Sequence, residues 1–208
     1  MPVKICLLRF ADYGLGGETP PLRAKMLLIC PGIHEIELTE CFLNGIIENW
    51  KEQQQLGELL ILPTQKYPAY SSFDIYNFIQ KNPPKSDIII ISFSAGVAGA
   101  IGAALAWEQF GGKIKAFIAI DGWGVPLVAN FPIYRISHDY FTHWSSALLG
   151  SGNESFYAEP AVEHLELWRS PQTTKGWWNH ETSTGLKTAT PTTVTLFIQN
   201  ILKSNLLI

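Results

Sequence analysis

The sequence has few charged residues and few cysteines. Only 16% of its 208 residues are Asp, Glu, Lys or Arg, and the formal net charge is −3 without any basic run. Binding to nucleic acid or to an anionic membrane needs clustered cations, so neither is an expected partner. Its three cysteines, Cys6, Cys30 and Cys41, are odd in number and scattered. They argue against a disulfide scaffold and favour reduced thiols in a cytoplasmic protein.

The chain has one long uncharged run, the twenty residues Ile88–Trp107. That length could span a bilayer, but residues 88–91 are β-branched and favour a strand. Residues 97–107 are rich in Ala and Gly and suit a helix packed closely on a sheet, and no Lys or Arg cluster flanks the run. We therefore expect a strand, a turn and a helix rather than a membrane span. The start, MPVKICLLRF, lacks a small-residue cleavage site, so we expect no signal peptide.

Short apolar runs alternate with helical patterns along most of the chain. This alternation predicts an α/β fold, a mostly parallel, doubly wound sheet with helices on both faces. The length fits a single domain, 1–208, although the fold of residues 1–24 stays open. A last helix is expected to open at Pro191. The predicted strands are 25–30, 59–62, 87–93, 115–120, 132–137 and 155–158.

Residues 92–96, Ser-Phe-Ser-Ala-Gly, lie between the β-branched strand and the Ala/Gly-rich helix. The pattern is close to G-x-S-x-G, in which a tight turn exposes a serine hydroxyl at the top of a sheet. Ser92 stands in the first glycine position, where a small residue is needed. Ser94 is therefore the candidate nucleophile; in the alternative reading it is only a helix N-cap.

From about Lys25 onward the chain resembles small, lid-poor α/β-hydrolases, the serine esterases and lipases of that fold. The resemblance implies hydrolysis of an ester or thioester by a Ser-His-Asp triad in the chain order Ser, Asp, His. The matching positions are Ser94, Asp139 after strand 132–137, and His164 after strand 155–158. Asp121 and His180 are the alternative acid and base.

The same resemblance implies an oxyanion hole of two backbone N–H groups. Ala95 follows the nucleophile and is the first donor. The second is Ile33, in the loop where Gly32 lets the chain turn, with His34 as an alternative. Glu163 departs from the resemblance, because a glycine usually precedes the catalytic histidine.

Other features of the sequence bear on cofactors, on a cap or lid, and on the lining of the site. No cofactor is expected, and we set aside a metal site because no helical histidine pair or further ligands accompany residues 138–143. The short link 121–131 leaves no room for a cap domain, which predicts an open site or a lid formed by residues 170–190. Several tryptophans could line an apolar pocket or pack in the core: Trp123, Trp144, Trp168, Trp177 and Trp178.

Two functions follow from these observations. The first is a serine hydrolase whose partner is a small-molecule acyl substrate. The alternative is a non-catalytic ligand-binding or interaction protein on the same scaffold, since a fold does not fix a function. The oligomeric state is not indicated by the sequence.

Overall fold

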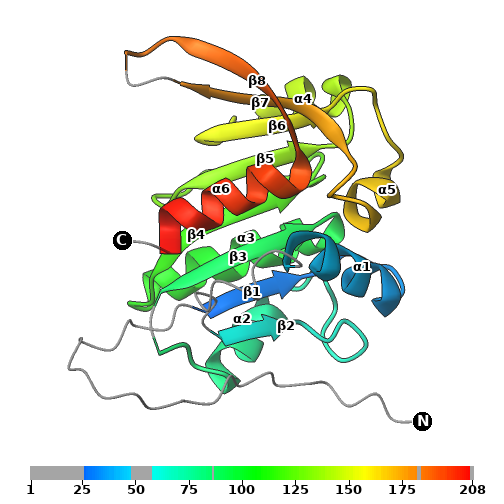
Figure 1. The fold of residues 1–208 in the computed structure, drawn as a ribbon. Helices are drawn as coiled ribbons and strands as arrows, with labels where there is room; N and C mark the ends of the chain where they lie inside the picture. The colour runs from blue at the N-terminus through cyan, green and yellow to red at the C-terminus, as the bar shows by residue number, and fades with distance from the viewer. Residues whose placement is uncertain (1–25, 48–57, 86, 182–183, 207–208) are drawn as a thin grey trace, which may run out of the picture.

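The computed structural model describes residues 26–47, 58–85, 87–181 and 184–206. These residues form an α/β structure around one eight-stranded, mostly parallel sheet (Figure 1). The strands lie in the order β2-β1-β3-β4-β5-β6-β7-β8. Residues 1–24, whose fold the sequence left open, lie outside the described part of the chain.

Six strands pair in parallel, and each matches a predicted run to within one residue at either end. Apolar residues dominate these strands because both faces of the sheet are covered, and every side chain of residues 26–30 and 88–93 is buried. The strands are β1 (Met26–Cys30), β2 (Glu58–Ile61), β3 (Ile88–Phe93), β4 (Ile114–Ile120), β5 (Ile133–Ser137) and β6 (Glu154–Ala158).

Two antiparallel strands, β7 (Lys175–Glu181) and β8 (Lys187–Thr193), extend the sheet beyond β6. The prediction that residues 170–190 form a lid is therefore wrong: most of this segment pairs with the sheet instead. The expected helix start at Pro191 is also wrong. Pro191 lies in β8, the edge strand, where its missing N–H costs no ladder hydrogen bond.

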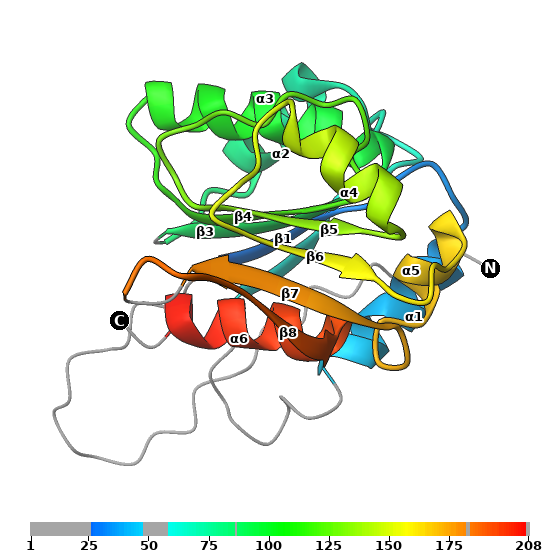
Figure 2. The same cartoon turned by 90° about the horizontal axis from the view of Figure 1, so that it is seen from above.

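The described helices cover both faces of the sheet (Figure 2). A separate cluster of buried apolar side chains lies on each face, so the sheet divides the core in two. On one face lie α1 (Ile36–Ile47), α5 (His164–Arg169) and α6 (Val194–Leu206). On the other lie α2 (Ser72–Lys81), α3 (Ala95–Gln109) and α4 (Tyr140–Ala147).

The uncharged run of the sequence forms β3 and α3, as predicted. The small residues of α3 allow a close approach to neighbouring backbone: a Cβ on Gly99 would collide with the carbonyl oxygen of Ala69. Among the described residues, no helix is both long and apolar enough to cross a bilayer.

Candidate active site

Ser94 occupies a sharp turn between β3 and α3. Its φ of 53° and ψ of −126° are unusual for a residue with a side chain. In the described part of the chain, the only other non-glycine residue with a positive φ is Asp121, at 51°. Such conformations cost on the order of 1–3 kcal/mol and cluster at functional sites. The two residues follow neighbouring parallel strands, β3 and β4, at the same edge of the sheet.

Sheet hydrogen bonds hold both turns in place. The Ser94 N–H donates to the carbonyl of Ile120 at 2.9 Å, and the Asp121 N–H donates to the carbonyl of Ile136 at 2.8 Å. Ser92, in the usual glycine position, is fully buried, and its hydroxyl donates to the Ile118 carbonyl at 3.2 Å. The replacement is accommodated because the extra polar group has a partner.

Two glycines bring the end of β1 against the Ser94 turn. A Cβ on Gly96 would collide with the carbonyl oxygens of Cys30 and Pro31, and a Cβ on Gly32 would lie 2.9 Å from the Ser94 Cβ. The loop that follows β1 is therefore packed directly against the serine. Only residues without a side chain permit this approach.

His164, the first residue of α5, joins Ser94 to a carboxylate. Its Nε2 lies 2.9 Å from Ser94 Oγ, and its Nδ1 lies 2.7 Å from Asp121 Oδ2. An ionised carboxylate only accepts hydrogen bonds, so Nδ1 holds the ring proton and Nε2 offers its lone pair to the Ser94 hydroxyl. A hydroxyl in this position can transfer its proton to the imidazole. The structure thus brings together Ser94 and His164, both predicted site residues.

The carboxylate bonded to His164 is Asp121, not the predicted Asp139. Asp139 is the N-cap of α4, where its Oδ1 accepts a hydrogen bond from the Thr142 N–H at 2.6 Å. The sequence left Asp121 as the alternative acid. It reaches His164 because it ends β4, the strand next to β3.

Asp121 is a buried carboxylate that accepts hydrogen bonds from two histidines. Only 5% of the residue is exposed, and this burial disfavours its charge, but hydrogen bonds from His138 and His164 outweigh the penalty. The net effect places the pKa of Asp121 below its ordinary value, so the carboxylate is ionised at neutral pH.

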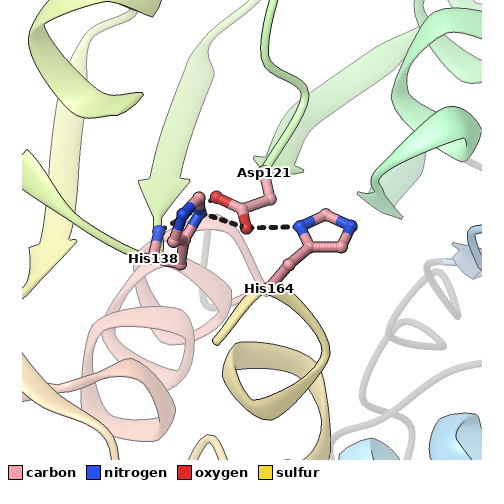
Figure 3. Close-up of side chains that lie close together, drawn as sticks. All are labelled: Asp121, His138 and His164. Atoms are coloured by element: carbon pink, nitrogen blue, oxygen red, sulfur yellow. Dashed lines mark hydrogen bonds and ion pairs between the residues drawn. The ribbon is translucent and has the colours of Figure 1, made fainter. Parts of the chain in front are cut away.

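A second imidazole, that of His138, binds the same carboxylate (Figure 3). Its Nδ1 lies 2.7 Å from Asp121 Oδ2, and its backbone N–H donates to Asp121 Oδ1 at 2.9 Å. Sequence reasoning considered His138 only as a possible metal ligand and missed this role. Its position in the sequence could have indicated this role. His138 directly follows β5, and β5 is the neighbour of β4, which Asp121 follows.

Asp121, His138 and His164 offer three possible metal-ligand atoms within 4.8 Å of one another. Both ring nitrogens, however, lie 2.7 Å from the same oxygen. Tetrahedral ligands at about 2.0–2.1 Å from zinc would be about 3.3 Å apart. The observed spacing is that of hydrogen bonds, which already account for the cluster.

The alternative base, His180, lies toward the opposite end of the strands from Ser94. β7 runs antiparallel to β6, so Gly176 pairs with Ala158 at the carboxyl end of β6, and Asn179 pairs with Ser155 near its start. His180 lies one residue farther from the end of the sheet that carries Ser94. Its Nε2 is 3.1 Å from the Thr188 hydroxyl. It is not part of the Ser94 cluster.

The predicted oxyanion donors lie beside the serine. Ala95 is the first residue of α3, so its N–H has no acceptor within the helix. Ile33 follows Gly32 in the loop against Ser94, and its side chain is 73% exposed. The His34 ring instead packs against Phe93 and Trp168. Glu163 is an exposed N-cap of α5, so its charge remains in solvent despite standing in a usual glycine position.

The tryptophans separate into two groups. Trp168 is fully buried, and Trp177 and Trp178 lie in β7. Trp123 and Trp144 are exposed at the Ser94 edge, where other large apolar side chains are also exposed. These exposed residues, the apolar rim, are Ile33, Trp123, Tyr140, Phe141, Trp144 and Leu165.

No protein-family model and no curated protein matches this sequence. The function is therefore inferred from the chemistry of the residues around Ser94. These provide a hydroxyl, an imidazole with its free nitrogen toward that hydroxyl, and a buried carboxylate behind the imidazole.

Proposed function

We propose that the protein is a serine hydrolase that cleaves an ester or thioester, built as an α/β-hydrolase without a cap domain. The observation that supports this most directly is the pair of hydrogen bonds made by His164, 2.9 Å to Ser94 and 2.7 Å to Asp121. The order along the chain also fits, with the serine after β3, the acid after β4 and the base after β6. Asp121 replaces Asp139 as the acid.

In the first half of the reaction, Ser94 Oγ attacks the carbonyl carbon of the substrate while His164 Nε2 accepts the hydroxyl proton. Asp121 stabilises the imidazolium that forms, because its charge lies against Nδ1. The imidazolium then gives the proton to the leaving alcohol or thiol. An acyl group remains on Ser94.

In the second half, a water molecule attacks the acyl-enzyme and His164 accepts its proton. Transfer of that proton to Ser94 releases the acid and restores the enzyme. In both halves negative charge develops on the carbonyl oxygen, where the N–H groups of Ala95 and Ile33 are the proposed donors. The positive end of the α3 dipole adds to their effect.

The apolar rim favours a substrate with a hydrophobic group beside its carbonyl. Trp123 follows Asp121 by two residues, and its indole N–H donates to Ser145 of α4 at 3.2 Å, which places it beside the exposed aromatic side chains of that helix. Burial of such side chains against an acyl chain releases about 25 cal/mol per Å² of apolar surface.

A fluorophosphonate probe tests the proposal, because it labels only an activated serine. The wild-type protein should gain one adduct by intact-mass analysis, and peptide mapping should place it on Ser94. Ser94→Ala should gain none. Ser151→Ala, which removes an exposed hydroxyl from the loop before β6, is the matched control and should be labelled like the wild type.

A positive result should be followed by hydrolysis of p-nitrophenyl esters of increasing chain length. If the wild-type protein folds but neither labels nor hydrolyses any of them, the alternative of a non-catalytic binding protein on this scaffold is favoured. Labelling that persists in Ser94→Ala would also contradict the proposed nucleophile.

A further inference from the structure

Asp121 lies between two imidazoles, and only one of them contacts Ser94. His138 and His164 both place Nδ1 at 2.7 Å from Asp121 Oδ2, from opposite sides of the carboxylate (Figure 3). Their ring centroids are 6.1 Å apart. The proposed mechanism uses His164 alone, so the second ring needs its own explanation.

His138 has acidic groups on several sides. Asp121 faces its Nδ1, and Asp139 Oδ2 lies 3.4 Å from its Nε2. Glu163, from the start of α5, adds a further negative charge, and His164 lies across the carboxylate. The hydrogen bond that the His138 ring donates to Asp121 raises the pKa of His138 above its ordinary value, against partial burial. The side chain is 27% exposed, so it can exchange protons with solvent.

We propose that His138 is a positioning residue whose protonation state sets how strongly Asp121 supports His164 as the base. The proposal rests on the proposed function. His138 holds both carboxylate oxygens, one through its backbone N–H and one through its ring, and thereby fixes the oxygen that faces His164. Its ring can also gain a positive charge, and its Nδ1 lies 2.7 Å from the Asp121 oxygen that contacts His164.

The sign of the effect follows from the charges. When His138 is protonated, it offsets the Asp121 charge and repels the imidazolium that forms on His164 during the reaction, so the rate is low. As the pH rises through the pKa of His138, that positive charge is lost and the full carboxylate charge stabilises the His164 imidazolium. The rate should therefore depend on two coupled ionisations on its acidic side.

The pH dependence of kcat/KM on a p-nitrophenyl ester tests this in three proteins. In the wild type, two ionisations should shape the acidic limb of the pH profile. His138→Asn keeps a neutral amide donor near Asp121 but cannot titrate, so only one ionisation should remain in its profile. Asp139→Asn should move the His138 step to lower pH, because a carboxylate that favours the charged ring is removed. Its amide oxygen can still cap α4.

The ring nitrogen shifts of both histidines, followed by NMR over the same pH range, give a readout that does not require activity. In His138→Asn the ring nitrogen shifts of His164 should no longer show a second pH-dependent step, because the residue across Asp121 can no longer gain a charge. If both variants keep the wild-type acidic limb and the His164 shifts keep their wild-type pH dependence, the proposal for His138 is overturned. Absence of Ser94 labelling would instead overturn the proposed function.

Discussion

The imidazole of His164 stacks on the phenyl ring of Phe93, with ring centroids 4.7 Å apart and 22° between the planes. The indole of Trp168 also stacks on Phe93, at 4.8 Å and 14°. His164 and Trp168 are four residues apart on α5, so both rings lie on one side of the helix. Phe93 directly precedes Ser94, and the end of β3 therefore positions both the serine and its proposed base.

Phe93→Leu should slow the labelling of Ser94 while the protein stays folded. Leucine fills much of the same buried space but offers no ring face to the imidazole, so His164 gains rotational freedom. A stacked pair contributes about 0.5–1.5 kcal/mol beyond its buried area, and the labelling rate should fall by about three- to tenfold. The rate of fluorophosphonate labelling, measured by intact mass over time, checks this.

Phe117→Leu is the matched control, since Phe117 is equally buried but belongs to the core cluster on the other face of the sheet. Both variants should lose thermal stability by a similar amount. Equal labelling rates in the two variants would mean that Phe93 acts only through stability.

The parallel strands could be predicted because apolar residues dominate them. A run such as residues 88–91, four isoleucines, has few alternatives to a buried strand. The turn at Ser94 could be predicted for a related reason, because small residues on either side allow strand and helix to approach. Local pattern was sufficient in both cases.

Long-range pairing was the part that the sequence did not reveal. β7 includes Trp177 and Trp178 but lacks a regular alternation, and β8 contains Pro191, which argues against a strand in isolation. β7 forms because β6 offers a partner, and β8 then pairs with β7. The carboxylate that contacts His164 was predicted wrongly because Asp121 and Asp139 each follow a strand at the same end of the sheet. Which carboxylate meets His164 depends on how the chain turns after each strand.

Asp121→Asn should nearly abolish labelling of Ser94. An amide in place of the carboxylate removes the charge that stabilises the His164 imidazolium, and its NH₂ group can hold the ring in the wrong tautomer. Loss of an orienting acid from such a triad lowers the rate by roughly three to four orders of magnitude. The labelling rate should be measured at about pH 9, where histidine is largely neutral.

Asp139→Asn separates the two candidate acids. At the same pH it should label within about twofold of the wild type, because Asn caps a helix about as well as Asp and Asp139 is not the carboxylate that contacts His164. Greater loss in Asp139→Asn than in Asp121→Asn would reverse the assignment of the acid.

Gly96→Ala should damage the site without touching any proposed catalytic side chain. The new methyl group would meet the carbonyl oxygens of Cys30 and Pro31, which are backbone atoms, so the loop after β1 must move away from α3. That movement would carry the Ile33 N–H away from the Ala95 N–H and disrupt the proposed oxyanion hole. Overpacking of this kind costs about 1–3 kcal/mol, so both the melting temperature and the labelling rate should fall.

Gly102→Ala makes the same change on the same helix, but there the obstruction is Ser72 of α2, whose Oγ can rotate away and whose Cβ, at 2.9 Å, needs only a small shift of α2, away from the Ser94 turn. Alanine is also the better helix former by about 1 kcal/mol. Gly102→Ala should therefore keep the wild-type labelling rate. If Gly96→Ala labels and melts as the wild type does, the close contact between β1 and α3 is not what holds the site together.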